Sequence, residues 1–173
     1  MTFHPEPALQ TPSALAMRAY LDTYLNADTS ALRRLLADAA VFEFPFASGT
    51  IPPILRGSAE IVRYYKALPG KTKVRACRGV DIHDTLDPDF AVAEFTTEAT
   101  VLATRRSYRS RHVAKLRCEW GKIVHYTEYW DSLLIREASG APDNGPVPDA
   151  WTYRFRSADP EQSDAGREDE TGT

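Results

Sequence analysis

The stretch that decides the fold covers residues 121–131 and reads Gly-Lys-Ile-Val-His-Tyr-Thr-Glu-Tyr-Trp-Asp. Its opening Gly-Lys pair is typical of a tight turn, and the β-branched and aromatic residues that follow predict a strand. Because alternate side chains of a strand share one face, Tyr126, Glu128 and Trp130 should lie on the same side of the sheet. The opposite side should carry His125, Thr127 and Tyr129.

Glu128 is therefore the first candidate for chemistry. Burying a carboxylate between two large aromatic rings disfavours its charged form, so we expect the pKa of Glu128 to be raised. A carboxyl group tuned in this way can work as a general acid or base near neutral pH. The alternative is that Glu128 lies on a solvated strand face and has no chemical role.

The composition of the chain narrows the class of protein. Its 173 residues, of which 43% are hydrophobic, are expected to form one domain with a sizeable core. The net charge of −3 and the dispersed Lys and Arg residues argue against a nucleic-acid partner. No apolar run reaches the ~18–20 residues that span a bilayer, and the N-terminus lacks the pattern of a secretory signal. We therefore expect a cytoplasmic protein with no membrane partner, in which Cys77 and Cys118 are free, buried thiols.

Helical patterns dominate the first part of the chain. The Thr11-Pro12 pair can cap and start a helix, and apolar residues then recur with the period of an amphipathic helix. Asp28 can cap a second, short helix that includes Leu36. A third helix is expected within residues 57–70, because a Gly-Ser pair can begin it and a Pro-Gly pair can end it.

Strand patterns dominate the second part. A short strand is expected before the third helix, and four long strands should follow it, at residues 73–83, 90–103, 108–120 and 121–131. Their short connections favour antiparallel pairing. A curved antiparallel sheet needs helices over its concave face to close a core. The expected architecture is therefore a half-barrel with a cone-shaped cavity between the sheet and the N-terminal helices.

This order of elements resembles the SnoaL-like branch of the NTF2-like, or cystatin-like α+β, superfamily. The residues that carry the resemblance are Gly57 with the helix behind it, Gly121-Lys122-Ile123, and Glu128-Tyr129-Trp130-Asp131 followed by Leu133 and Leu134. The resemblance covers about residues 12–139 and implies the α+β half-barrel. The superfamily includes steroid isomerases, polyketide cyclases, small dehydratases, epoxide hydrolases and non-catalytic binding modules, so the fold alone leaves the reaction open.

Within this superfamily, the phenazine-biosynthesis subfamily is the most similar in pattern. Tyr108 and His112 resemble its Tyr-x-x-x-His strand, and Glu128 matches a carboxylate that acts there as an acid/base group facing a carbocyclic intermediate. Two features differ, because Asp131-Ser132 stands where that subfamily has Asn-Pro, and Tyr64 and Tyr65 occupy the region of its third-helix histidine. The resemblance thus implies acid/base chemistry on a hydrophobic small molecule rather than phenazine synthesis.

Strand parity adds further catalytic candidates. Tyr108 and His112 share the less charged face of their strand, so they should point inward, where His112 could relay a proton or orient Glu128. A purely structural histidine is the alternative. Glu94 would be a second ionisable group in the cavity if its face points inward, and a solvated surface charge otherwise. Asp131 could reach the cavity mouth, as a matching aspartate does in polyketide-cyclase relatives, or cap the helix after it.

Aromatic side chains are expected to wall the cavity, although aromatic residues in these positions can also be ordinary core. The expected substrate-binding set is Tyr20, Tyr24, Phe42, Phe46, Tyr64, Tyr65, Tyr108, Tyr126 and Trp130.

Two functions from different classes follow. The first is a cofactor-independent isomerase, cyclase or dehydratase acting on a polycyclic or aromatic natural-product intermediate. The second is a non-catalytic module that binds a hydrophobic small molecule. None of the four His residues has metal-ligand spacing, and the chain has no glycine-rich nucleotide motif or nucleophile elbow, so neither a metal nor a cofactor is expected.

The domain is expected to span residues 12–139, after a flexible N-terminus at 1–11. Residues 140–158 should form an aromatic extension that docks on the domain or a partner, and the acidic tail 159–173 should be disordered. We also expect a homodimer, because relatives often pair through the outer sheet face. The apolar residues assigned to that face are Phe95, Val101, Val113 and Val124.

Overall fold

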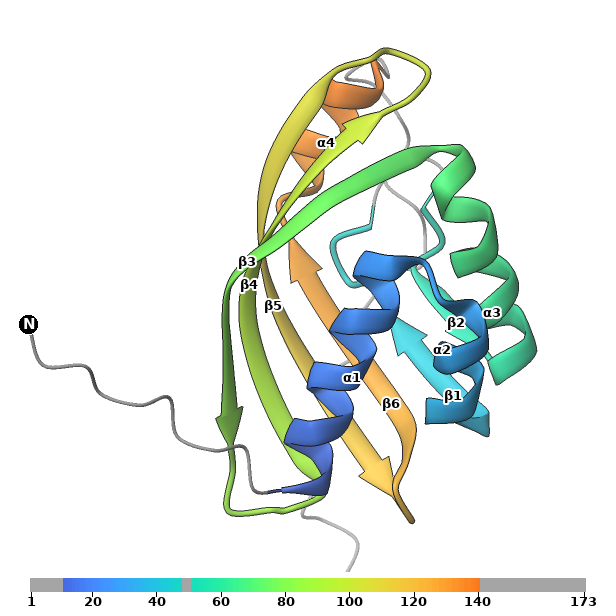
Figure 1. Ribbon diagram of the computed structural model, residues 1–173, viewed down its shortest axis with the longest axis vertical. Helices are drawn as coiled ribbons and strands as arrows, with labels where there is room; N and C mark the ends of the chain where they lie inside the picture. Colours follow the sequence, from blue (N-terminus) through green and yellow to red (C-terminus); the bar gives the residue numbers. More distant parts are fainter. Residues whose placement is uncertain (1–10, 48–50, 141–173) are drawn as a thin grey trace, which may run out of the picture.

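The computed structural model describes residues 11–47 and 51–140, so the predicted aromatic extension and acidic tail lie outside the described residues. It shows a mixed α+β fold built on one six-stranded, curved and unclosed sheet (Figure 1). The strand order across the sheet is β2-β1-β6-β5-β4-β3. The strands are β1 Leu36–Glu43, β2 Ile54–Arg56, β3 Thr72–Asp84, β4 Phe90–Val101, β5 Ser107–Glu119 and β6 Lys122–Trp130.

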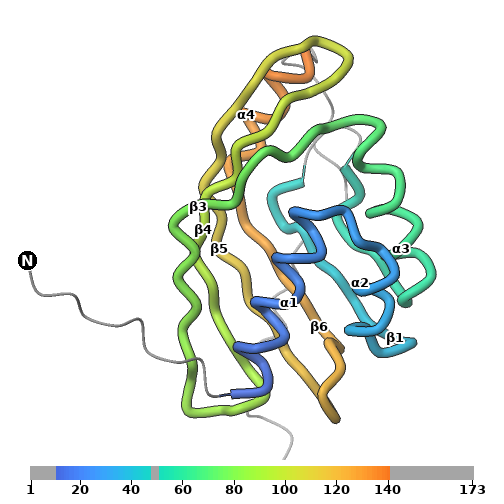
Figure 2. Tube along the Cα trace, viewed as in Figure 1, coloured from blue at the N-terminus to red at the C-terminus, as the bar shows by residue number. Residues whose placement is uncertain are grey.

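Four helices accompany the sheet. They are α1 Pro12–Asn26, α2 Thr29–Leu35, α3 Ser58–Ala67 and α4 Ser132–Ser139, with a short 3₁₀ turn at Leu68–Gly70. Helix α1 lies across the concave face and packs on the long strands, while α2 and α3 lie beside β1 and β2 (Figures 1 and 2). The buried side of α1 carries Met17, Tyr20 and Leu21, as its apolar period predicted.

Strands β3 to β6 form the predicted antiparallel meander. The β5–β6 turn places Trp120 and Gly121 at its centre, with φ of 51° and 71°. Positive φ at both central residues matches the twist of a two-residue hairpin, and glycine takes it without strain. This turn and the bulge at Val124 together set the register of β6, and hence the face on which Tyr126, Glu128 and Trp130 lie.

The start of β1 differs from the sequence prediction. Leu36 was expected in the second helix, but it is the first residue of β1, where it pairs with Ile123. Strand β1 runs parallel to β6 and antiparallel to β2, so the sheet is mixed rather than a pure meander. A short run rich in buried leucines fits a helix and a buried strand equally well. The pairing of Leu36 with Ile123 makes this position part of the strand.

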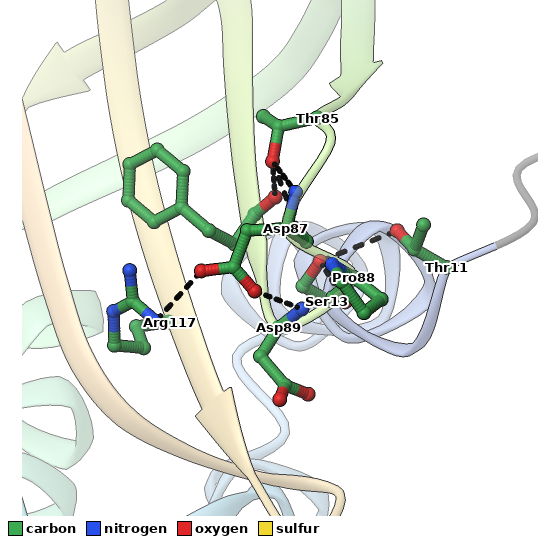
Figure 3. Close-up of polar contacts among 8 residues, drawn as sticks. Thr11, Ser13, Thr85, Asp87, Pro88, Asp89 and Arg117 are labelled. Atoms are coloured by element: carbon green, nitrogen blue, oxygen red, sulfur yellow. Dashed lines mark hydrogen bonds and ion pairs between the residues drawn. The ribbon is translucent and has the colours of Figure 1, made fainter.

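The N-terminal end of α1 is tied to the β3–β4 turn (Figure 3). The Ser13 hydroxyl donates to the carbonyl of Pro88 over 2.8 Å, and the Thr11 hydroxyl donates to the carboxylate of Asp84. Asp87 of the same turn pairs with Arg117 of β5 over 3.0 Å. The contacts of Thr11 and Ser13 fix the N-terminal end of α1 against the end of β3 and the turn after it.

The outer face of the sheet is more polar than predicted. Phe95 and Val101 were placed there, but both are buried on the inner face, because Phe95 pairs with the inward His112 and Val101 follows the same alternation. Val113 is 42% exposed on the outer face, and Val124 is half-buried at a bulge in β6. Cys118 is buried, Cys77 is half-buried, and both thiols are free. None of the helices within residues 11–47 and 51–140 has the length and apolarity needed to cross a membrane.

Candidate active site

The centre of the candidate site is a buried pair formed by Glu128 and His112. Nδ1 of His112 lies 2.7 Å from Oε1 of Glu128. The His112 side chain is 6% exposed and the Glu128 side chain is 12% exposed. The contact is close but lacks the alignment of a hydrogen bond. A carboxylate beside an imidazole is a pairing suited to general acid/base chemistry, and Glu128 is the member that is more open to the cavity.

Two residues of β4 hold His112 in place. The hydroxyl of Thr97 lies 2.8 Å from Nε2 of His112 and forms a buried hydrogen bond with it. The ring of Phe95 stacks on the imidazole with 4.9 Å between centroids and 2° between planes. With Nε2 bound to Thr97, Nδ1 is the nitrogen that lies against Glu128, so Thr97, His112 and Glu128 are in contact in that order.

Strand register explains why these side chains converge. His112 pairs with Phe95 on one side and with Trp130 on the other. Glu128 pairs with Ala114, which pairs with Ala93, and both alanines are fully buried. Because both alanine side chains are small, they leave room beside the carboxylate. Behind it, the aromatic side chains of the core close the space.

The pair opens into a cavity of about 360 Å³. Its walls come from the ends of α1 and α3, the start of β3, the end of β4, β5, β6 and α4. The aromatic members of the wall are Tyr24, Phe44, Tyr64, Tyr65, Tyr108 and Trp130, and the ionisable side chains are His112, Glu128 and Lys71. The indole N–H of Trp130 is buried and has no hydrogen-bond partner among the described residues.

The tyrosines around Glu128 remain protonated at neutral pH. Burial, followed by the nearby Glu128 carboxylate, raises the pKa of Tyr24, Tyr64 and Tyr108 above the ordinary value. Burial likewise raises the pKa of Cys77 to about 11, again with Glu128 as the second cause. The hydroxyls of these tyrosines therefore act as hydrogen-bond donors rather than as bases.

The structure brings together some of the predicted residues. Glu128, His112, Tyr24, Tyr64, Tyr65, Tyr108 and Trp130 all line the cavity. Tyr20, Phe42 and Tyr126 lie behind the cavity wall in the core, where their rings contact one another at centroid distances of 4.5–5.7 Å. An aromatic side chain fits a cavity wall and a core equally well. The nearly complete burial of these three side chains assigns them to the core.

Three predicted residues lie away from the cavity. Glu94 is exposed on the outer face, opposite Val113, because the register of β4 turns Phe95 and Thr97 inward. Asp131 is exposed and caps α4 by accepting from the backbone N–H of Leu133 at 3.0 Å. Phe46 is also exposed, on the outer side, where it meets Tyr129 with 5.4 Å between centroids.

Sequence reasoning missed Thr97, Phe95 and Phe44. The signal for Thr97 and Phe95 was the alternation on β4, which the charge on Glu94 left ambiguous until the β5 pairing was known. Among residues 11–47 and 51–140, no cluster of three or more His, Cys, Asp or Glu side chains is arranged to hold a metal ion.

Sequence comparison agrees with this architecture. The SnoaL-like domain pattern matches residues 17–126. The uncharacterized protein YesE of Bacillus subtilis (strain 168) is 29% identical over 124 residues, which are 72% of this chain and 84% of that protein. A PhzA/B-like protein of Pseudomonas aeruginosa, PA3332, is 27% identical over 115 residues, which are 66% of this chain and 81% of that protein.

Structure comparison gives the same result. The crystal structure of a Bacillus subtilis protein that is provisionally named an isomerase matches with a TM-score of 0.70 and 27% identity. The match covers 76% of this chain and 94% of that chain. The shared region is the half-barrel that holds the cavity.

Proposed function

Because this chain belongs to the SnoaL-like domain family, we propose that it is an acid/base enzyme, an isomerase, cyclase or dehydratase, that works with its own side chains on a hydrophobic aromatic or polycyclic intermediate. The observation that carries the proposal is the 2.7 Å contact between His112 and Glu128 at the inner end of an aromatic cavity. A module that only binds an apolar ligand has no need for a buried ionisable pair, which costs desolvation energy.

The proton step follows from the geometry of the pair. Glu128 takes a proton from a carbon next to a carbonyl group of the substrate, and the electron pair of the broken C–H bond moves toward the carbonyl oxygen to form an enolate. The protonated Glu128 then returns the proton to another atom, or to a leaving hydroxyl group, which leaves as water. General acid–base catalysis of this kind contributes about 10²–10⁴ in rate.

His112 and the donors of the wall have supporting roles in this scheme. His112 can hold the proton that Glu128 exchanges, while Thr97 keeps the imidazole oriented. The developing negative charge on the carbonyl oxygen needs donors, and the neutral hydroxyls of Tyr64 and Tyr108 in the cavity wall can supply them. The aromatic wall favours flat, apolar substrates.

The test uses substitutions that remove charge and keep shape. Native mass spectrometry of the protein from its producing host identifies a co-purified ligand, and turnover of the matching compound is then measured. Glu128→Gln should lower turnover by at least ~10²-fold while affinity and folding are kept. Glu94→Gln is the matched control on the outer face and should behave as wild type. Turnover close to wild type in Glu128→Gln would refute the assignment.

A further inference from the structure

A second chamber of about 340 Å³ lies next to the Glu128 cavity. It is formed by the C-terminal end of α1, the start of α2, the end of α3 and the first residues of β3. The two spaces share five lining residues, which are Tyr24, Tyr65, Leu68, Thr72 and Val74. The spaces are thus neighbours on either side of one thin partition.

The wall of the second chamber is mainly apolar, although Lys73 and a few other polar side chains border it. Leu25, Leu32 and Leu102 line it in addition to the shared residues. Its polar groups are largely used within the protein, because the Thr23 hydroxyl donates to the carbonyl of Tyr20 at 2.7 Å and Asp28 caps α2. What remains for a ligand is mainly hydrocarbon surface, which favours an alkyl or isoprenoid-like group.

Tyr24 is one of the five side chains that form this partition. Tyr24 contacts Tyr65 edge-on with 6.2 Å between centroids. Its hydroxyl forms no hydrogen bond with any residue in the described part of the chain, whereas the hydroxyls of Tyr20 and Tyr65 are bonded to each other. A rotation of Tyr24 therefore breaks no hydrogen bond and would join the two chambers.

We infer that the substrate has two parts: a ring that carries the reacting proton and lies in the Glu128 cavity, and an apolar tail that passes Tyr24 into the second chamber. The placement of the ring rests on the proposed function, while the placement of the tail rests on the shared partition and the apolar wall. The substrate class is accordingly a tailed aromatic or alicyclic compound rather than a compact ring system.

The experiment measures the binding of 4-alkylphenols, from ethyl to decyl, by titration calorimetry. For wild type, Kd should fall by about fourfold for each methylene that enters the second chamber. Leu25→Trp fills this chamber from α1, where Leu25 is 37% exposed, and Leu102→Trp fills it from the opposite wall, where Leu102 is 44% exposed. Both variants should bind the short members as wild type does and lose the gain from long tails, by tenfold or more at the decyl member.

Leu15→Trp is the matched control, since Leu15 is an exposed residue of the same helix that lines neither chamber. It should reproduce the wild-type series. Equal tail dependence in wild type and in both filling variants would overturn the inference, as would a wild-type series with no gain along the tail. Short-chain binding and the turnover of Glu128→Gln report separately on the catalytic cavity, so failure of the proposed function remains distinguishable.

Discussion

The imidazole of His112 lies parallel to the ring of Phe95, with 2° between their planes and 4.9 Å between their centroids. The stack fixes the plane of the imidazole, and the hydrogen bond between Thr97 and Nε2 fixes its rotation. The Glu128 carboxylate therefore meets a nitrogen whose position is set from β4 and not from β6 itself. The geometry of the pair therefore depends on the register of β4 and β6, two strands that are not adjacent in the sheet.

Thr97→Val tests this positioning. Valine keeps the shape and the strand preference of threonine but leaves Nε2 of His112 buried without its partner, which should cost about 1–3 kcal/mol of unfolding free energy. The pH profile of turnover should also change, because the imidazole loses the bond that selects its tautomer. Chemical denaturation and ¹⁵N NMR of the His112 ring nitrogens measure the two effects.

Thr96→Val is the control for this substitution. Thr96 is the next residue on β4 and faces the outer side, opposite Arg111. It should leave both the stability and the His112 spectrum close to those of wild type. Identical behaviour of the two variants would show that Thr97 has no special role in the site.

Asp131→Ala separates a helix cap from a catalytic role. The Asp131 carboxylate accepts the Leu133 N–H at the start of α4, and loss of such a cap costs about 0.5–2 kcal/mol. We expect a lower midpoint of denaturation with turnover within a fewfold of wild type. Asp131→Asn should restore most of the stability, because asparagine also caps helices. A loss of turnover in Asp131→Asn comparable to that in Glu128→Gln would return Asp131 to the catalytic set.

The buried hydroxyls of Tyr20 and Tyr65 are expected to be energetically coupled, because their oxygens lie 2.5 Å apart in the core. Tyr65→Phe leaves the Tyr20 hydroxyl buried without a partner and should destabilise the protein by about 1–3 kcal/mol. The double variant Tyr20→Phe with Tyr65→Phe removes both hydroxyls and should cost less than the sum of the single variants. Urea denaturation of all four proteins gives the coupling, and strictly additive losses would contradict it.

That Tyr126, Glu128 and Trp130 share one face of β6 could be predicted from the sequence, because their spacing follows the two-residue period of a strand. The face of β4 could not, since Glu94 alternates with small and aromatic residues and both faces contain polar groups. Only the pairing of Phe95 with His112 decides it. The sequence also could not show how deeply each aromatic side chain is buried. Tyr20 and Tyr24 lie one helical turn apart on α1, yet Tyr20 belongs to the core and Tyr24 lines the cavity.

We propose that the protein is a homodimer that pairs through the outer face of the sheet. The exposed Val113, the Tyr129 ring beneath the Lys115 ammonium group and a shallow groove beside them offer a mixed apolar and charged surface. Light scattering at tens of micromolar protein should give twice the chain mass of 19.3 kDa. Val113→Glu should shift that mass toward the monomer. A mass of 19.3 kDa for wild type would refute the proposal.

Alkaline pH should unfold the protein steeply, because burial raises the pKa of many tyrosines in the folded state. The affected residues are Tyr20, Tyr24, Tyr64, Tyr65, Tyr108 and Tyr126. The folded pKa of each lies above the unfolded value of about 10, so the protein keeps the resulting stability below pH ~10 and loses it as the pH rises further. Each tyrosine that ionises only in the unfolded chain removes about 1.4 kcal/mol per pH unit above that value.

Absorbance of tyrosinate at 295 nm, followed together with circular dichroism, should show these residues ionising in one step with loss of structure, whereas the chain in guanidinium should titrate near pH 10 without a step. Smooth ionisation of all tyrosines near pH 10 with the fold intact would show that the cavity wall is open to water, and the donor role assigned to its hydroxyls would then fail.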